Sequence, residues 1–234
     1  MSATELQERL KALGDARVAA SSRRFFKTGP GEYGAGDLFR GIRVPVLRAL
    51  AKEYQSVSSQ EAGRLLRSPF HEDRLLALLL LVRLYARGDE AAREKIYRLY
   101  LKNTRYINNW DLVDSSAEHI VGAHLRERGR GPLRLLAKSA DLWERRIAVL
   151  ATFHYVKRGE FEETFRVARA LLSDREDLIH KAVGWMLREV GKRDPLAEDG
   201  FLKKHYRRMP RTMLRYAVER FPEEKRRRYL KGEV

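Results

Sequence analysis

Five similar stretches decide the fold of this chain: RLLAL (74–78), DSSA (114–117), RIAVL (146–150), KAVGW (181–185) and TMLRY (212–216). Their first residues are 40, 32, 35 and 31 positions apart. Each stretch lies early in a longer block with apolar residues at helical spacing, and a shorter helical block precedes it. Helix pairs that recur about every 30 to 47 residues are typical of α-solenoids of the HEAT or armadillo kind. We therefore expect an all-α solenoid of stacked helix pairs.

Short segments rich in Gly, Pro, Ser and Asp separate the helical blocks, for example at 88–89, 129–132 and 194–195. One helix pair cannot bury its own apolar face, so neighbouring pairs stack and share a continuous core. We therefore expect a single elongated domain over residues 1–234, with a curved, concave wall.

The composition excludes several classes of protein. The chain has no cysteine, which rules out disulfides and cysteine-based zinc sites and favours a reducing cytosol. Its longest apolar run, residues 75–82, is far shorter than the roughly 20 residues that span a bilayer. The N-terminus is polar and acidic, unlike a signal peptide. We expect a cytoplasmic protein without a membrane partner.

The charge points to a polyanionic partner. The 48 Lys and Arg residues outnumber the 32 Asp and Glu residues, which gives a net charge of +16. Phosphate neutralisation with counterion release supplies much of the affinity for nucleic acids. Basic residues are spread through many helices rather than held in one amphipathic anchor, which favours DNA over a membrane surface. We expect a basic concave face that grips duplex DNA at the nucleoid.

One aligned position of the repeats breaks the basic pattern. It holds Arg74, Asp114, Arg146, Lys181 and Thr212 in the five stretches. Basic residues there suit contacts to the DNA backbone, whereas a carboxylate repels phosphate. Either Asp114 forms an ion pair with Arg146 or Lys181, or it serves chemistry. Neighbouring cations would keep it ionised, and it could then stabilise an oxocarbenium-like sugar or position a water molecule.

Tryptophans accompany this position. Trp110 precedes Asp114 by four residues, so both lie on one side if the helix includes them. Trp185 follows Lys181 by four residues and precedes Arg188 by three, so these three share a face. An aromatic wall beside cations and a carboxylate suits a sugar with partial positive charge. The alternative for each tryptophan is that it packs in the protein core and faces no ligand.

Two neighbours of these motifs receive structural roles. We assign Trp143 to the core, and Asp111 is well placed to cap a helix N-terminus.

Two segments depart from the repeat. Residues 28–41 (TGPGEYGAGDLFRG) hold five glycines and form either a connector or a finger that touches nucleic acid, with Tyr33 and Arg40 at its ends. Residues 203–231 carry 12 Lys and Arg against 3 acids, and their aromatic residues favour a folded, phosphate-contacting helix pair over a disordered tail. The residues predicted to contact DNA are Lys27, Arg40, Arg74, Arg145, Lys181, Arg188, Arg211 and Arg215.

Three motifs in this order resemble the AlkD-type DNA alkylation repair family, the HEAT-like DNA glycosylases. They are NWDLVDS (109–115), WERRIAVL (143–150) and KAVGWMLRE (181–189), with a weaker echo in RFFK (24–27). The resemblance covers roughly residues 5–220, and the combined order and spacing of the motifs is specific to that family.

The resemblance implies a stack of helical repeats that holds duplex DNA and hydrolyses the N-glycosidic bond of cationic N3- and N7-alkylated purines, leaving the base in the helix. Asp114 then matches the catalytic carboxylate, Trp110 and Trp185 match the aromatic pair that faces the deoxyribose, and Arg146 matches the arginine beside them. A purine that already carries positive charge leaves easily, so neither a general acid nor a metal is required.

Two departures from that family keep other functions open. The glycine-rich segment is longer than in catalytically active relatives, and Phe25 stands where a tyrosine is expected. One alternative is therefore an inactive relative that binds branched or distorted DNA, and another is a HEAT-repeat scaffold that binds an acidic peptide. The histidines show no metal-binding spacing. We expect a monomer without cofactor or metal.

Overall fold

The longest apolar run of the sequence forms the centre of helix α5 (His71–Arg87), where Leu76, Leu78 and Leu81 are completely buried. The computed structural model describes residues 1–234. Its regular structure is helical, apart from one isolated bridge between Leu38 and Phe70. None of its helices combines the length and the apolarity that crossing a membrane requires.

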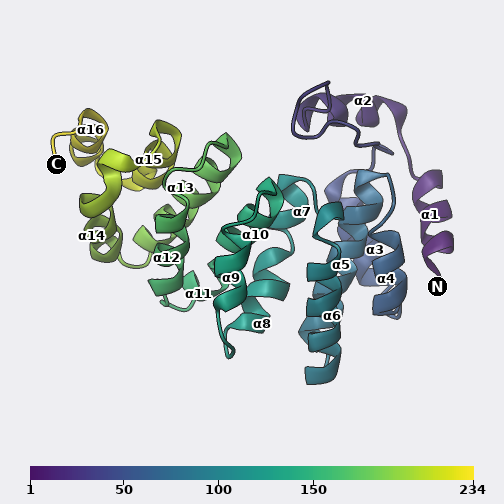
Figure 1. Ribbon diagram of the computed structural model, residues 1–234. Coiled ribbons are helices and arrows are strands. Elements are labelled where there is room, and N and C mark those ends of the chain that lie inside the picture. The colour runs from purple at the N-terminus through teal and green to yellow at the C-terminus, as the bar shows by residue number, and fades with distance from the viewer. The chain divides into compact units, whose positions relative to one another are not determined.

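The helices group into two compact units, residues 1–120 and 121–234 (Figure 1). The first unit contains α1 (Ala3–Ala12), α2 (Ala16–Phe25), α3 (Val44–Glu53), α4 (Ser59–Leu65), α5, α6 (Glu90–Lys102), the 3-10 turn η1 (Thr104–Tyr106) and α7 (Trp110–Asp114). A π-helical turn, η2 (Glu118–Gly122), contains the boundary between the units.

The second unit contains eleven further elements. They are α8 (Ala123–Leu125), α9 (Gly131–Leu136), α10 (Leu142–Ala151), α11 (Phe153–Val156), α12 (Glu162–Ala170), α13 (Asp177–Gly191), α14 (Pro195–His205), α15 (Arg211–Ala217) and α16 (Glu223–Lys231), with 3-10 turns η3 (Tyr206–Arg208) and η4 (Val218–Arg220).

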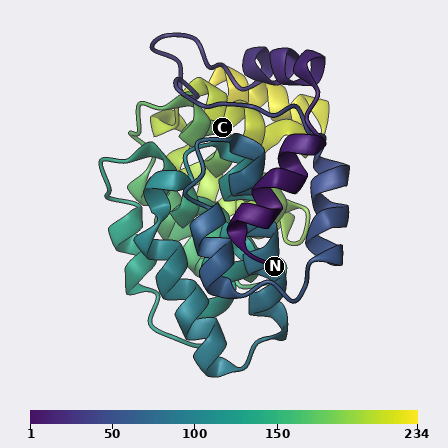
Figure 2. The same cartoon turned by 90° about the vertical axis from the view of Figure 1, so that its right-hand side faces the viewer.

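Within the first unit, α5 is the central helix and packs against α3, α4, α6 and α7. Helix α2 and the glycine-rich segment after it run across the ends of these helices, as two perpendicular views show (Figures 1 and 2). Asp15 caps α2 by accepting hydrogen bonds from two backbone N–H groups. The N-terminal part of the unit is therefore placed over the start of α5.

Within the second unit, α13 is the central helix and packs against α10, α12, α14 and α15. It lies close to α15, where a Cβ at Gly184 would lie 2.4 Å from the carbonyl oxygen of Met213. The basic C-terminal segment is folded, as predicted, because Tyr206 and Tyr229 are buried with their rings 5.4 Å apart.

The structure confirms the all-α, HEAT-like class. The predicted order of a shorter helix before a longer one holds in only some of the helix pairs. A shorter helix precedes a longer one in the pairs α4–α5, α9–α10 and α12–α13, but the order is reversed in α6–α7 and α14–α15. Helix α7 ends at Asp114, after which the Ser116 hydroxyl donates back to the carbonyl of Leu112 at 2.6 Å. The single elongated domain and the concave basic wall stay predictions.

Candidate functional site

Helix α7 is one short turn that carries Trp110, Asp111 and Asp114. The buried Asn109 is its N-cap and accepts the backbone N–H of Trp110 at 2.8 Å. The prediction that Asp111 caps this helix is therefore wrong, and its side chain is free to bond elsewhere. Trp110 and Asp114 begin and end the same helix, four residues apart as predicted, and both are half-buried.

An aromatic cluster covers the start of this helix. The ring of Phe26 stacks on Trp110 with centroids 5.5 Å apart, and Phe25 meets Trp110 edge to face at 5.8 Å. Phe25 itself is 64% exposed. Because aromatic residues of this size are normally buried, an exposed Phe25 beside Trp110 leaves an apolar surface open to a ligand.

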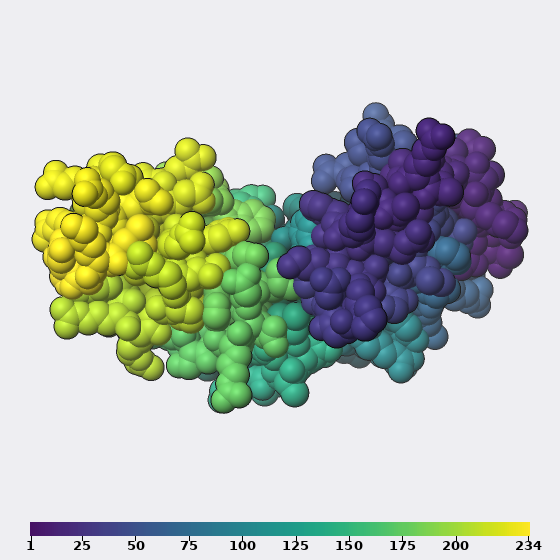
Figure 3. Space-filling view, turned by 90° about the horizontal axis from the view of Figure 1, so that it is seen from above, coloured from purple at the N-terminus to yellow at the C-terminus, as the bar shows by residue number.

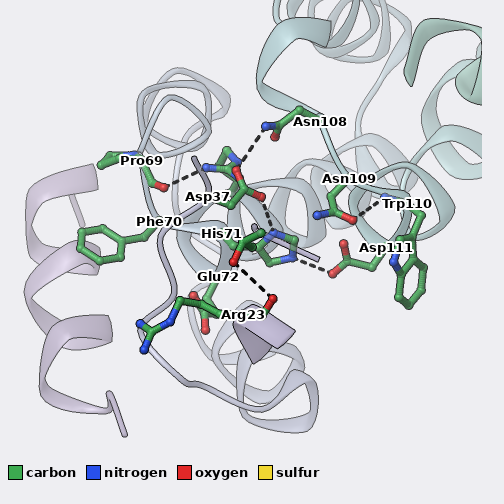
Figure 4. A network of polar contacts seen from close by, with 12 residues as sticks. Arg23, Asp37, Pro69, Phe70, His71, Glu72, Asn108, Asn109, Trp110 and Asp111 are labelled. Atoms are coloured by element: carbon green, nitrogen blue, oxygen red, sulfur yellow. Dashed lines mark hydrogen bonds and ion pairs between the residues drawn. The ribbon is translucent and has the colours of Figure 1, made fainter. Parts of the chain in front are cut away.

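A buried histidine connects α7 to two other segments (Figure 4). His71 Nε2 lies 2.8 Å from Asp111 Oδ2, and its Nδ1 lies 3.3 Å from Asp37 Oδ2. Burial by itself would lower the pKa of His71, but the hydrogen bonds to Asp111 and Asp37 outweigh it and raise the pKa to about 9. His71 is therefore an imidazolium at neutral pH.

Asp37 is held by further donors. Arg74 Nη2 donates to its Oδ1 at 2.7 Å, and Asn108 donates to the same oxygen at 3.2 Å. Burial acts to raise the pKa of Asp37, but the His71 hydrogen bond and the charges of His71 and Arg74 outweigh it, so the pKa lies below its ordinary value. Asp37 thus faces His71 as a carboxylate.

Arg74 was expected to contact the DNA backbone, and the structure corrects this. The residue is only 4% exposed, and its guanidinium also donates to the carbonyls of Ser68 and Pro69 at 3.1 Å. A guanidinium enclosed by one carboxylate and two carbonyls is a structural cation rather than a phosphate contact.

Arg40 requires the same correction. It forms a bidentate pair with the buried Asp73 at 2.6 and 2.9 Å, and its guanidinium lies 3.9 Å from the ring centroid of Phe70. Its backbone N–H donates to Glu72 at 2.9 Å. One end of the glycine-rich segment is therefore fastened to the start of α5.

The middle of the glycine-rich segment has a different environment. Most residues between Gly29 and Gly36 are exposed, and the segment lies on the face of the first unit that is seen from above (Figure 3). Tyr33 is half-buried. Lys27, at the start of the segment, is exposed and has a positive φ of 52°. The segment thus combines an anchored end with an exposed tip.

In the second unit, α13 contains Lys181, Trp185 and Arg188 at the predicted spacing, and all three are half-buried. Lys181 forms an ion pair with Asp177 at 2.7 Å, and Arg188 pairs with Glu219. The indole N–H of Trp185 donates to Glu189 at 3.3 Å. Trp185 therefore has a fixed orientation on its own helix.

Glu189 receives three donors in all. Lys192 Nζ lies 2.5 Å from its Oε1, and Arg193 Nη1 lies 3.2 Å from its Oε2. Burial acts to raise the pKa of Glu189, but these hydrogen bonds outweigh it and lower the pKa. The ring of Phe153 lies 5.9 Å from Trp185. The indole is thus flanked by a carboxylate and an aromatic ring.

Two arginines of α10 are bonded within the second unit. Arg146 is 5% exposed and donates to the carbonyl of Leu178 at 2.6 Å. Its guanidinium is therefore not accessible to the phosphates of a DNA backbone. Arg145 pairs with Asp174 at 2.7 Å and donates to the carbonyls of residues 139 and 140. Because these partners occupy its donors, the expected DNA contact of Arg145 is not supported.

Among the residues of the second unit that are predicted to contact DNA, the exposed ones lie on α15. Arg211 and Arg215 are both exposed, and the Arg211 guanidinium donates to the carbonyl of Leu230. Arg215 and Lys181 line an open cavity of about 440 Å³ formed by α13, α15 and α16. These residues retain the accessibility that a phosphate contact requires.

Sequence reasoning missed the residues that orient the tryptophans. Asp37 lies in a glycine-rich segment, and the spacing of His71 from the other histidines indicates no metal site. A polar residue at a predicted helix start, such as His71, carries no local signal for partners 34 and 40 residues away. Glu189 ends the motif at 181–189, but its hydrogen bond to the indole of Trp185 is visible only once the side chains are placed on the helix.

One family model matches nearly the whole chain. The family model described as DNA alkylation repair enzyme matches residues 6–221. A structure titled a predicted DNA alkylation repair enzyme from Enterococcus faecalis is similar at a TM-score of 0.69 and 17% identity, over 90% of this chain and 97% of that one.

The structure of smu.31 from Streptococcus mutans UA159 is similar at a TM-score of 0.51 and 17% identity, over 96% of this chain and 98% of that one. At these identities the two structures show a shared fold. No curated protein matches the sequence significantly.

Proposed function

Because this chain belongs to the DNA alkylation repair enzyme family, we propose that it is a DNA glycosylase acting on cationic N3- and N7-alkylated purines in duplex DNA. It acts as a monomer in base excision repair at the nucleoid, in the cytoplasm, and leaves the damaged base in the helix. The proposed catalytic residues are Asp114, Trp110 and Trp185. Arg146, which is buried, is proposed as a positioning residue that holds α13 through the carbonyl of Leu178.

The observation that carries this proposal is the joint placement of Trp110 and Asp114 on one short helix. Both side chains are half-buried, so they are held by the fold but can still reach a ligand. The exposed Phe25 lies against Trp110 and extends the apolar surface. A deoxyribose fits beside such a surface, with the carboxylate directed at its developing positive charge.

The chemistry needs one carboxylate and one water molecule. The bond between C1′ and the purine nitrogen breaks, and its electron pair moves to the base, which leaves as a neutral alkylpurine. Asp114 stabilises the oxocarbenium-like sugar electrostatically. A water oxygen then bonds to C1′, and the proton it loses passes to Asp114 and on to solvent, which leaves an abasic site. Trp110, on the same helix as Asp114, stabilises the cationic sugar through its ring face.

Binding depends on cations that the fold leaves accessible. The net charge of +16 supplies a general attraction to DNA. Lys27, Arg211 and Arg215 are exposed, while Lys181 and Arg188 are half-buried and paired with acids that phosphate can replace. These five cations are the proposed contacts to the DNA backbone.

Base release from methylated DNA tests the proposal. We expect the wild-type protein to release 3-methyladenine or 7-methylguanine from duplex DNA, measured by chromatography of the free bases under single-turnover conditions. Asp114→Asn keeps the shape of the side chain but removes its charge, so release at saturating enzyme should fall at least about 100-fold. DNA affinity should be equal or higher, because a repulsive carboxylate is gone.

Glu127→Gln is the matched control. It neutralises a carboxylate whose side chain is 76% exposed and which pairs only at the surface, with Arg126. Its release rate should equal that of the wild type. A wild type that releases no alkylated purine excludes the glycosylase activity, and an Asp114→Asn variant as fast as the wild type excludes the role of Asp114.

One observation favours a second function, the binding of branched or distorted DNA without catalysis. The tip of the glycine-rich segment is exposed while one end of the segment is anchored through Arg40, as expected of a finger that contacts a non-linear duplex. A wild type that releases no base but binds a four-way junction more tightly than linear duplex of equal length supports this function instead.

A further inference from the structure

Both ring nitrogens of His71 face carboxylate oxygens. Nε2 lies 2.8 Å from Asp111 and Nδ1 lies 3.3 Å from Asp37, and the residue is only 2% exposed. A carboxylate can only accept hydrogen bonds, and a neutral imidazole has a single N–H. Only the doubly protonated ring satisfies both acceptors, so the geometry by itself selects the imidazolium.

Three charged side chains surround His71, and each comes from a different segment that packs against it or carries it. Asp37 faces it from the glycine-rich segment, Asp111 from α7, and Arg74 from its own helix. Arg74 disfavours the proton, but its guanidinium is bonded to Asp37, so that two cations and two carboxylates balance. The ring of Phe39 stacks on the imidazole with centroids 4.8 Å apart, and the ring of Phe26 lies tilted against it at 4.7 Å.

Helix α7 depends on this cluster because it cannot be stable alone. A five-residue helix is far below the length at which isolated helices form in water. Two contacts hold its first turn: the stacking of Trp110 on the ring of Phe26, and the hydrogen bond between Asp111 and His71. Asp114 lies three residues after Asp111, on the same side of the helix. The bond to His71 therefore sets the rotation of α7 and the direction of Asp114.

We propose that His71 is a positioning residue of the base-excision reaction: as an imidazolium between Asp37 and Asp111, it orients α7 so that Trp110 and Asp114 face the damaged nucleotide. This role rests on the proposed glycosylase function and extends it to a buried residue that touches no substrate. Deprotonation of His71 leaves one N–H for two carboxylates, so the cluster that holds α7 loses one hydrogen bond and the positive charge between the two acids. The excision step should then slow at alkaline pH, while DNA binding through the exposed cations remains.

The test measures single-turnover base release as a function of enzyme concentration and pH. For His71→Gln, the maximal rate should fall by about 10²-fold, as expected of a misplaced catalytic group, while the half-saturating concentration stays within about 3-fold of the wild type. His119→Gln is the control, because His119 is an exposed histidine of the same unit.

The pH profile separates positioning from general structural support. The wild-type rate should fall as pH rises through about 9, where His71 loses its proton. Asp111→Asn removes one of the two carboxylates, so the fall should move to lower pH. The proposal is wrong if His71→Gln retains the wild-type rate, or if the alkaline fall stays in place in Asp111→Asn.

A measurement on the wild type covers the case in which the variants do not fold. Nitrogen-15 NMR of the His71 ring at pH 7.5 should show two protonated nitrogens, and a single protonated nitrogen overturns the proposal. A wild type that releases no base instead refutes the glycosylase function itself. Wild-type release together with an unaffected His71→Gln refutes only the role of His71.

Discussion

Glu198 shows how burial sets the charge of a single side chain. The residue lies in α14, is 2% exposed, and one of its carboxylate oxygens has no hydrogen-bond partner. Burial raises the pKa of Glu198 to about 8, the neighbouring carboxylate of Asp199 adds to the rise, and the charge of Lys225 opposes it. Glu198 is therefore largely protonated at neutral pH.

The direction of this shift predicts a pH-dependent stability. The folded state holds the proton more tightly than the unfolded state, so stability falls as pH rises from about 4.5 towards 8. Glu198→Gln removes the ionisation while keeping the shape. We expect the variant to be more stable than the wild type at pH 8 and nearly equal at pH 4.5, as measured by urea unfolding. An equal difference at both pH values contradicts a buried, protonated Glu198.

Helix α13 illustrates how one residue permits two elements to approach. Glycine normally weakens the interior of a helix by about 1 kcal/mol relative to alanine. At Gly184, however, a methyl group would lie 2.4 Å from the Met213 carbonyl and 2.5 Å from the Cβ of Tyr216. The close contact with α15 therefore needs glycine at this position, next to Trp185.

Replacing this glycine should separate the two helices. We expect Gly184→Ala to lower the free energy of unfolding by about 1–3 kcal/mol, as overpacking does. Gly200→Ala, in α14, is the control, because nothing lies within 4 Å of a Cβ there. That variant should gain about 0.5–1 kcal/mol from helix propensity. Urea unfolding measures both, and a Gly184→Ala protein as stable as Gly200→Ala would show that α15 adjusts without cost.

At the scale of the whole molecule, folding decides which of the many Lys and Arg side chains stay accessible to phosphate. Arg40, Arg74 and Arg145 are bound to acids and carbonyls of their own units. Arg215 is exposed and lines an open cavity. The net charge is a property of the composition, but the folded chain decides which cations can meet phosphate.

The exposed arginines should govern the salt dependence of DNA binding. Replacing Arg211 or Arg215 by Ala should weaken binding to duplexes of any sequence and flatten the slope of log K against log salt by up to about 0.9 each. Arg98→Ala, on α6, is the control, because its exposed side chain pairs with Glu94 and belongs to no proposed contact. Titrations at several salt concentrations measure the slope, and an unchanged slope removes α15 from the contact surface.

The sequence by itself determined the features that depend on local pattern. Apolar spacing predicted the helices, and the aligned stretches predicted the starts of α5, α10 and α13 to within a few residues. The spacing of Trp110 and Asp114 placed both on one helix. These inferences succeed because helix formation depends on neighbours three and four residues away.

Only the tertiary structure decided the partner of each polar side chain. Nothing local distinguishes Arg74 from Arg215, yet the first is enclosed by Asp37 and the second is exposed. The His71 cluster joins three segments that are distant in sequence. Burial, ion pairing and pKa depend on which segments meet in space, because desolvation and hydrogen bonds act over a few ångströms regardless of sequence separation. The helices were therefore predictable from the sequence, while the bonds that orient them were not.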